Sequence, residues 1–290
     1  MHANAIEIRG LEKSFPKFKL GPIDLTVPTG AIYGFVGPNG AGKTTTIDLI
    51  FGMGGKDAGS ITVLGLNHIS DEVRMKQQVG YVSPDLNFLL WRRVGAAIQF
   101  VRGFYPTWDE NYCERLLDAF HLRRDEKIPT LSFGARIKLS LVLALSWRPK
   151  LLILDEPTVG LDAISKQQVF SELLAAVREE DRTVFISSHS LTDLERFADN
   201  VGMLKAGQMV FEGPMNGVIE RYRMVDFIAN ESADFRDRVG LVVQSRQDNR
   251  WRVLIDVDST PVEWIRSHGA TPISDSPVTL EELFVALGKE

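Results

Sequence analysis

Apolar and polar positions along the first sixty residues alternate in short runs that are typical of strands. Residues 5–9 and 23–27 indicate two short strands, and a third run at 31–36 follows a Pro-Thr-Gly turn. A glycine-rich stretch comes next, and residues 43–51 have the character of a helix that further glycines terminate. The pattern therefore predicts a strand, a glycine-rich loop and a helix in direct succession.

The middle of the chain combines helical periodicity with continuous apolar runs. Residues 60–64 and 80–82 predict two more strands, and helical periodicity prevails from about residue 84 to 149. The runs at 151–154 and 183–186 are typical of strands buried on both faces of a parallel sheet, with an amphipathic helix between them. This order favours an α/β core with a helical insertion.

Composition changes after residue 214, where a smaller unit is expected. Residues 251–256 predict one strand, and residues 262–268 and 279–287 predict two helices. Residues 222–290 contain 8 basic and 12 acidic residues and so hold most of the net charge of −5. The tail is therefore expected to form a separate unit.

Bulk composition excludes several classes of protein. The 290 residues, 44% hydrophobic and 24% charged, suit a soluble chain of about two domains. A net charge of −5 has the wrong sign for a protein that mainly binds nucleic acid. Cys113 is the only cysteine, which excludes an intramolecular disulfide and agrees with a reducing compartment. The sequence has no signal-peptide pattern and no run near the ~18 apolar residues of a membrane span.

The glycine-rich stretch has the spacing of a phosphate-binding loop. Residues 37–44, GPNGAGKT, fit G-x-x-x-x-G-K-[ST] between a predicted strand and a predicted helix. Backbone N–H groups and the helix N-terminus would converge on phosphate oxygens. Lys43 would contact the β- and γ-phosphates, and the Thr44 hydroxyl would ligate Mg²⁺. The alternative is a glycine-rich surface turn, which the flanking elements disfavour.

Two adjacent carboxylates end the apolar run at 151–154. Asp155 and Glu156 would lie at the carboxyl edge of a buried strand, where open α/β sheets bind ligands. There Asp155 could hold Mg²⁺ and Glu156 could orient the attacking water of phosphoryl transfer. An acidic pair can also simply solvate a strand end, but a phosphate loop upstream in the same chain favours the catalytic interpretation.

Further short motifs stand in a fixed order around these two sites. Residues 131–135 read LSFGA, residues 160–162 read GLD, and residues 187–189 read SSH. This ordered set, over about residues 5–220, resembles the ATP-binding cassette (ABC) ATPases. The stretches at 103–109 and 280–284 resemble cassettes of bacterial exporter-type systems, including the YtrB type.

The resemblance implies a fold and a domain plan. The expected core is an α/β P-loop NTPase cassette with a mostly parallel sheet, an antiparallel β subdomain and a helical insertion, followed by a small C-terminal α+β appendage. The ABC ATPase domain would cover residues 1–220, with its helical subdomain at about 84–149, and the accessory domain would cover residues 221–290.

The resemblance also implies how the site is assembled. Two cassettes face head to tail around two ATP molecules, so the signature Ser132 and Gly134 of one chain would contact the γ-phosphate held by the other. Asp162 matches the D-loop aspartate that couples the two sites, and His189 matches the histidine that contacts the γ-phosphate. A histidine after a strand is more often structural, but this one is expected at the same sheet edge as Glu156.

An aromatic ring is expected against the adenine. Phe15 resembles the residue that stacks on the base, with Phe18 as the alternative and plain core packing as the third interpretation.

The expected catalytic residues are Glu156 and His189, and the expected metal ligands are Thr44 and Asp155. The residues expected to bind ATP are Phe15, Gly37, Pro38, Asn39, Gly40, Ala41, Gly42, Lys43, Thr44, Thr45, Ser132, Gly134 and Asp162.

The sequence departs from the family pattern at two places. Pro84 occupies the position where a glutamine usually contacts the metal and the water, and Asp85 could either substitute through a water or cap the next turn. The signature has Phe133 in place of the first of its two glycines and Ala135 in place of its glutamine. Residues 88–91, FLLW, could form an interface with a membrane subunit or pack within the insertion.

The resulting expectation is an ATPase that binds Mg-ATP, forms a homodimer or heterodimer and powers a separate integral membrane permease. No nucleic acid is expected as a partner, and the chain is expected on the cytoplasmic face of the membrane, held there by the permease. A soluble ABC ATPase acting on nucleic acid and a small-molecule kinase are the alternatives, but the first usually needs two linked cassettes and the second leaves residues 131–135 unexplained.

Overall fold

The structure, a computed structural model, describes residues 3–85, 91–180, 182–230, 235 and 238–288. The chain divides into two compact units. One comprises Met1–His189 and Leu204–Met209, and the other comprises Ser190–Met203 and Val210–Glu290. The domain boundary after residue 220 that the composition suggests differs from this division and stays a prediction.

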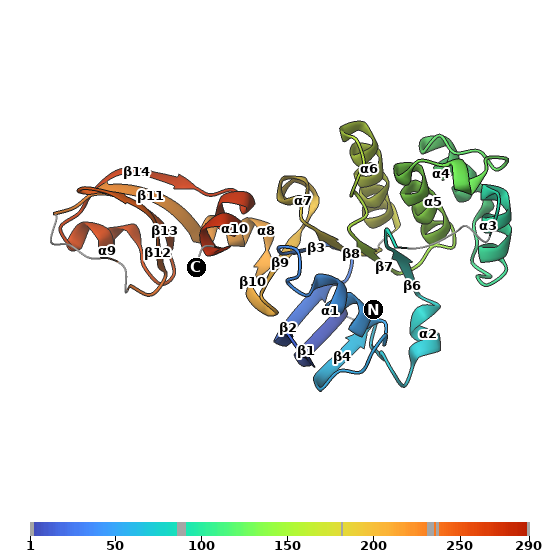
Figure 1. Cartoon of the computed structure of the whole chain (residues 1–290), viewed down its shortest axis with the longest axis horizontal. Helices are drawn as coiled ribbons and strands as arrows, with labels where there is room; N and C mark the ends of the chain where they lie inside the picture. Colours follow the sequence, from blue (N-terminus) through green and yellow to red (C-terminus); the bar gives the residue numbers. More distant parts are fainter. Residues whose placement is uncertain (1–2, 86–90, 181, 231–234, 236–237, 289–290) are drawn as a thin grey trace. The chain divides into compact units, whose positions relative to one another are not determined.

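An antiparallel sheet of four strands opens the first unit (Figure 1). Its order is β2-β1-β4-β5, with bounds β1 (Asn4–Phe15), β2 (Phe18–Pro28), β4 (Ala58–Val63) and β5 (Leu66–Asn67). Along β2, Ile23, Leu25 and Val27 are buried while the residues between them are exposed. This alternation gives the sheet one apolar face, which packs into a large hydrophobic core. The predicted strands at 5–9 and 23–27 are confirmed.

A second sheet has the order β10-β9-β3-β8-β7-β6. Its strands are β3 (Ile32–Val36), β6 (Val79–Val82), β7 (Leu151–Asp155), β8 (Thr183–Ser188), β9 (Asn200–Lys205) and β10 (Gln208–Pro214). The neighbours β3, β8, β7 and β6 run parallel, and every residue of β3, β7 and β8 is buried. The continuous apolar runs in the sequence are explained by this burial on both faces.

Helices connect the parallel strands and form the insertion. The helix α1 (Lys43–Ile50) follows β3, and α6 (Ala163–Glu180) connects β7 to β8. The insertion consists of α3 (Val94–Arg102), α4 (Glu110–Ala119), the 3₁₀ turn Ile128–Thr130 and α5 (Phe133–Leu145), with both α3 and α4 packed on α5 (Figure 1). The helical region is confirmed. Its first described helix begins at Val94 rather than near residue 84, and the short α2 (Glu72–Lys76) was not predicted.

The second unit contains an antiparallel sheet of its own (Figure 1). The order is β12-β13-β11-β14, with bounds β11 (Tyr222–Ile228), β12 (Leu241–Gln247), β13 (Arg250–Asp256) and β14 (Thr271–Pro277). The helix α9 (Val262–Ser267) packs on it through Ile265, against a core that contains Phe227 and Trp251. The remaining helices are α7 (Leu191–Phe197), α8 (Met215–Arg221) and α10 (Leu280–Gly288).

The prediction of a single strand in this unit was wrong, because four strands are present. The strand at 251–256 and the two helices are confirmed. The edge strand β14 has the sequence TPISDSP and is mostly exposed, so neither its composition nor its periodicity indicates a strand. Edge positions tolerate proline because one side of the strand needs no ladder hydrogen bonds.

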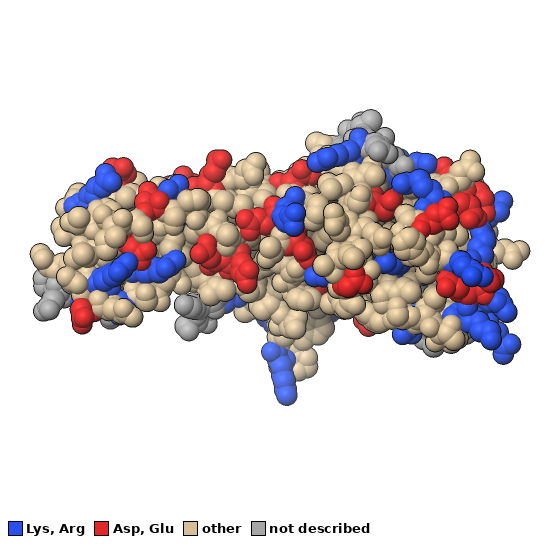
Figure 2. All heavy atoms as spheres, turned by 90° about the horizontal axis from the view of Figure 1, so that it is seen from above, with Lys and Arg blue, Asp and Glu red and all other residues tan. Residues whose placement is uncertain are grey.

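Charge is mixed on the surface that Figure 2 shows. Basic and acidic side chains lie interspersed among the coloured residues of this face, without an extended region of one sign. None of the helices in the described part of the chain has the length and apolar character needed to cross a membrane.

Candidate functional site

The parallel strands end in register, which brings four loops to one edge of the sheet. Val36 of β3 pairs with Ser188 of β8, and Asp155 of β7 pairs with Ser187 of β8. Val82 of β6 pairs with Leu154 in the same way. The glycine-rich loop, the acidic pair and the Ser-Ser-His segment therefore converge at the carboxyl edge, where open α/β sheets bind ligands.

The glycine-rich loop is tightly packed between its strand and its helix. Gly42 precedes α1 with a φ of 108°, and a Cβ at this position would lie 2.6 Å from the Leu20 side chain. A Cβ on Gly37 would lie 2.3 Å from the carbonyl oxygen of Leu204. Only glycine fits either position, so the spacing seen in the sequence reflects steric necessity as well as backbone access to an anion.

Lys43 begins α1, and its ammonium group is almost fully buried. The Nζ atom donates to the carbonyl oxygen of Gly37 at 2.8 Å and lies 3.5 Å from Oε1 of Glu156. The residue is 6% exposed, so its charge is held among loop carbonyls and one carboxylate rather than in water. A buried cation at a helix N-terminus favours a polyanionic ligand.

Thr44 and Asp155 present oxygen atoms side by side. The Thr44 hydroxyl donates to Oδ2 of Asp155 at 2.9 Å, and the Ser187 hydroxyl donates to Oδ1 of the same carboxylate. The charge of Asp155 also acts on Asp48 of α1, where burial and then this charge raise the pKa. A hydroxyl beside a fixed carboxylate is a suitable oxygen donor pair for Mg²⁺. Among the described residues, no group of three or more His, Cys, Asp or Glu side chains is placed to hold a metal ion.

Glu156 lies between the lysine and the histidine. Its Oε2 atom lies 2.7 Å from Nδ1 of His189 and accepts from the His189 backbone N–H at 3.3 Å. The Glu156 backbone N–H donates to the Ser187 hydroxyl at 3.1 Å and to the Ser187 carbonyl at 3.2 Å. Its φ of 48° is in the left-handed region, which is rare for a residue with a side chain and marks a position that its surroundings hold firmly.

A pocket of about 250 Å³ lies over this edge. Its lining residues are Phe18, Pro38, Asn39, Gly40, Gly42, Lys43, Thr44, Thr45 and Glu156. Most of the residues expected to bind ATP therefore surround one cavity. Ala41 of the same loop is 2% exposed and packs into the core instead.

Of the two candidate aromatic residues, Phe18 lines this pocket. The Phe15 ring lies 6.2 Å from the Phe18 ring, between centroids, and is 44% exposed. Lys13 Nζ lies 5.9 Å from the Phe15 ring centroid. Both rings are thus close to the phosphate loop, and the choice of Phe15 as the base-stacking residue stays a prediction.

The signature and D-loop residues belong to a different part of the first unit. Ser132 caps α5, where its hydroxyl accepts from the Ala135 backbone N–H at 3.1 Å. Asp162 precedes α6 and accepts from the Ser165 backbone N–H at 2.8 Å, which is the main reason that its pKa is lowered. Ser132, Gly134 and Asp162 do not line the pocket over the carboxyl edge.

The positions that depart from the family pattern follow β6. Ser83 is buried, Pro84 is half-buried, and the exposed Asp85 donates its backbone N–H to the Ser83 hydroxyl at 3.3 Å. Neither alternative for Asp85 is decided by this contact. Of the predicted interface at 88–91, residues 88–90 lie outside the described residues.

Ser187 is the residue of this site that sequence reasoning missed. It holds the Asp155 carboxylate with its hydroxyl, and it receives the Glu156 backbone N–H. A polar residue at the end of the apolar run 183–186 was the available signal, because the parallel register places it beside the end of β7.

Comparisons with known proteins bear on the family to which the chain belongs. The family model described as "ABC transporter" matches residues 20–159. The ABC transporter ATP-binding protein YtrB of Bacillus subtilis (strain 168) is 30% identical, over 97% of this chain and 97% of that protein. The bacitracin transport ATP-binding protein BcrA of Bacillus licheniformis is also 30% identical, over 69% of this chain and 66% of its own length.

A solved structure supports the fold. The ATP-binding subunit of an ABC transporter superposes with a TM-score of 0.65 and 24% identity, covering 74% of this chain and 92% of that one. The extended similarity to YtrB spans nearly the whole of both chains. The chain therefore belongs to the ABC transporter ATP-binding protein family, as an ATP-binding and ATP-hydrolysing subunit.

Proposed function

We propose that the pocket over the carboxyl edge binds the triphosphate of ATP and that Glu156 directs its hydrolysis. The observation that carries this proposal is the position of the Glu156 carboxylate, with one oxygen 3.5 Å from Lys43 Nζ and the other 2.7 Å from His189 Nδ1. A carboxylate between a phosphate-binding cation and a histidine is suited to orient a water for attack on the terminal phosphate.

Residues 37–45 would hold the phosphates. The backbone N–H groups of the loop and of the first turn of α1 provide neutral donors, and Lys43 adds the positive charge. Phe15, or Phe18 in its place, would stack on the base. The pocket is large enough for a phosphate group, and its lining includes residues of the glycine-rich loop and Glu156.

The residues present fit Mg²⁺. Thr44 and Asp155 supply a hydroxyl and a carboxylate oxygen 2.9 Å apart, and hard oxygen donors are what this ion requires. When bound, it neutralises charge on the phosphate oxygens. Ser187 keeps the carboxylate oriented through its hydroxyl.

Hydrolysis would proceed by in-line attack of water. Glu156 would accept a hydrogen bond from that water and align it with the phosphorus. His189 would contact the γ-phosphate while its Nδ1 atom remains paired with Glu156. The rigid backbone of Glu156, held by two contacts to Ser187, keeps the carboxylate in place for this task.

A second cassette would complete each site. Ser132 and Gly134 do not line the pocket of their own chain and lie at the N-terminus of α5, where backbone N–H groups can receive an anion. In a head-to-tail homodimer or heterodimer they would close over the partner's γ-phosphate, and Asp162 would couple the two sites. ATP would then shift the equilibrium toward the closed dimer, and loss of the γ-phosphate would reopen it.

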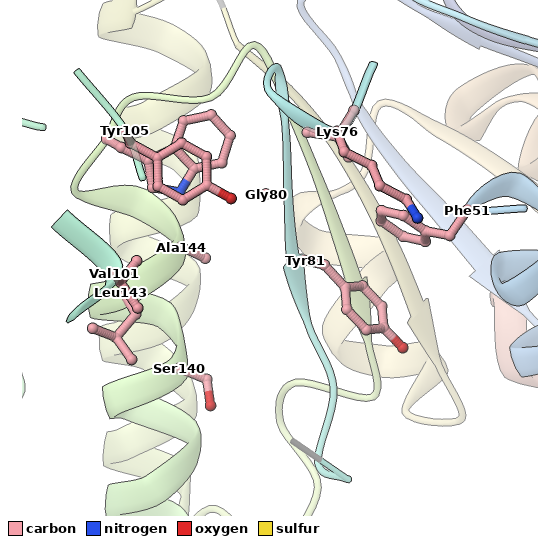
Figure 3. A pocket seen from close by; sticks show the side chains of 11 residues that line it. Phe51, Lys76, Gly80, Tyr81, Val101, Tyr105, Ser140, Leu143 and Ala144 are labelled. Carbon is pink, nitrogen blue, oxygen red and sulfur yellow. The ribbon is translucent and has the colours of Figure 1, made fainter. Parts of the chain in front are cut away.

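The partner of the dimer would be an integral membrane permease, which would hold the chain on the cytoplasmic face of the membrane. A groove of about 320 Å³ between β6 and the helical insertion supports this assignment (Figure 3). Figure 3 shows Tyr81 and Phe51 on one side and Tyr105, Val101 and Leu143 on the other. An apolar groove with aromatic walls suits an amphipathic helix of the permease.

Substitution of Glu156 by glutamine tests the hydrolytic assignment. Glu156→Gln should keep ATP affinity and slow steady-state hydrolysis by about 10²-fold or more, because glutamine cannot accept the proton of the attacking water. An ATP-bound dimer should accumulate, seen by size-exclusion chromatography with light scattering. The matched control Glu263→Gln removes the same charge from an exposed position in the second unit. Wild-type turnover in Glu156→Gln would remove Glu156 from this role.

Trp91 tests a separate candidate surface for the permease, the predicted interface at residues 88–91, because this residue does not line the groove of Figure 3. Its ring lies 4.8 Å from Phe100, between centroids, and Phe100 lies 5.0 Å from Phe104, so the three rings form an aromatic cluster on the insertion. Trp91→Asp should weaken co-purification with the membrane permease, without changing ATP affinity. Val239→Asp, at a position 76% exposed, is the control for an added charge. Unchanged association in Trp91→Asp would contradict this assignment.

A further inference from the structure

The unusual residue of the signature contacts the D-loop of its own chain. Gly160 has a φ of 68°, and a Cβ at this position would lie 2.9 Å from Cδ1 and 3.2 Å from Cε1 of Phe133. The Phe133 ring therefore rests on the α-carbon of Gly160. The adjacent signature residue makes the reciprocal contact, because a Cβ on Gly134 would lie 2.8 Å from Cδ2 of Leu161. Two signature residues and two D-loop residues thus interdigitate.

The D-loop is joined to the catalytic glutamate by two consecutive turns. The Val159 N–H donates to the Glu156 carbonyl at 3.2 Å, and the Leu161 N–H donates to the Thr158 carbonyl at 3.3 Å. Thr158 is 3% exposed, which fixes the middle of this segment in the core. A displacement of Gly160 would therefore be transmitted to Glu156 through short hydrogen-bonded turns rather than absorbed by a loose loop.

The other end of the D-loop is also anchored. The Asp162 carboxylate accepts from the Ser165 backbone N–H at 2.8 Å and from its hydroxyl at 3.0 Å, so it caps α6. Gly160 lies between these two fixed ends and has no side chain with which to pack. The Phe133 ring supplies the packing that this position lacks.

From these contacts we propose that Phe133 is a positioning residue, whose ring fixes the signature loop to the Glu156 turn of the same chain. The proposal rests on the proposed function, in which the two segments serve opposite ATP sites. Through this ring, closure of Ser132 and Gly134 on the partner's nucleotide is linked to the placement of the chain's own Glu156. Phe133 is 40% exposed, so more than half of its surface is covered by neighbouring residues.

Removal of the ring tests the proposal in the full-length protein. Phe133→Ala should lower kcat for ATP about 10-fold and change KM by less than about 2-fold, because the ring acts on the placement of Glu156 and not on nucleotide affinity. Phe133→Tyr keeps the ring on Gly160 and should restore kcat. A wild-type kcat in Phe133→Ala, or a raised KM with unchanged kcat, would overturn the proposal.

A double-mutant cycle identifies the contact itself. Gly160→Ala places a methyl group against the ring and should lower kcat, and in the Phe133→Ala background the same change should cost at least 3-fold less. Equal effects of Gly160→Ala in both backgrounds would refute the contact as the cause. Thermal melting of each variant detects a general folding defect, and if the Ala variant is unstable, Phe133→Leu, which keeps an apolar side chain and removes the ring, takes its place in the cycle with the same expected outcomes.

Failure of this proposal is distinguishable from failure of the proposed function. If Glu156→Gln hydrolyses ATP at the wild-type rate, the assignment of the catalytic carboxylate is wrong. If Glu156→Gln is inactive while Phe133→Ala keeps the wild-type kcat, the catalytic site stands and only the role of Phe133 is refuted.

Discussion

Two groups of charged residues, one in each unit, show how differently paired charges can be used. At the carboxyl edge of the parallel sheet, Lys43 Nζ is held by loop carbonyls and lies 3.5 Å from Glu156, which faces His189. In the second unit, Arg221 forms a bidentate pair with Asp256 at 2.9 and 2.6 Å. The first group borders a pocket of about 250 Å³. In the second group, Arg221 and Asp256 satisfy each other's hydrogen-bonding groups.

The difference between the two groups follows from their remaining hydrogen-bonding capacity. Asp256 accepts from Arg221, from the Asp258 backbone N–H and from the Ser259 hydroxyl, so its oxygens are occupied by residues of its own unit. Lys43 and Glu156 are too far apart for a hydrogen bond, and both line the pocket. A charge that is fully paired stabilises the fold, and a charge that is kept incompletely paired at a cavity is available for a ligand.

Removing the charge of Lys43 should produce the largest effect, a loss of affinity for Mg-ATP. Lys43→Met keeps the length of the side chain and removes the cation, so the affinity for Mg-ATP should fall by at least about 100-fold, or roughly 3 kcal/mol. Isothermal titration calorimetry measures this change. The melting temperature should stay close to that of the wild type, because the buried charge contributes to ligand binding rather than to folding.

Lys19→Met is the matched control for this substitution. The Lys19 side chain is 60% exposed and pairs with Glu12 at 2.9 Å, so removal of its charge should leave ATP affinity unchanged. A Lys43→Met variant that binds ATP normally but has a much lower melting temperature would contradict this prediction. The charge of Lys43 would then stabilise the fold, as we infer for Arg221, and would not serve ligand binding.

Much of the first unit could be predicted because local sequence patterns, such as glycine spacing and apolar runs, directly reflect steric and burial requirements of the fold. The glycine positions at 37 and 42 are sterically required, and a continuous apolar run such as that of β7 is what burial on both faces demands. Ser187 could not be assigned in advance, since its role depends on the register between β7 and β8. The same holds for the Phe133 contact, which joins segments far apart in the sequence.

The second unit was predicted less well because its strands carry weaker signals. Strand β11 shows three buried residues, Met224, Val225 and Phe227, without regular alternation. The edge strand β14 is largely exposed, and the edge strand β12 has one buried residue, Leu241, and an exposed polar end. Both strands are defined by hydrogen bonds, to β11 and β13 respectively. Pairing partners of this kind are fixed by tertiary structure, which local sequence does not encode.

Breaking the ion pair between Arg221 and Asp256 should have a smaller effect, and it should lower stability and leave ATP affinity unchanged. Asp256→Asn removes the bidentate carboxylate and leaves Arg221 with only the exposed Asp258 at 3.4 Å. It should lower the free energy of unfolding of the second unit by about 1–2 kcal/mol, a value reduced because half of the Arg221 side chain is exposed. ATP affinity should not change. Chemical denaturation followed by tryptophan fluorescence reports the loss, since Trp251 lies in the core of this unit.

The smallest expected effect is the pH dependence of the stability that the same pair contributes. The hydrogen bonds from Arg221 are the main reason that the pKa of Asp256 lies below its ordinary value of 3.8. A lowered folded-state pKa means that the stabilisation is complete above pH 3.8 and is lost as the pH falls through the lower value. The difference in unfolding free energy between wild type and Asp256→Asn should therefore be constant near neutral pH and shrink below pH 3.8. A difference that does not change with pH would show that the asparagine destabilises the unit through packing, and that the charge of Asp256 contributes nothing.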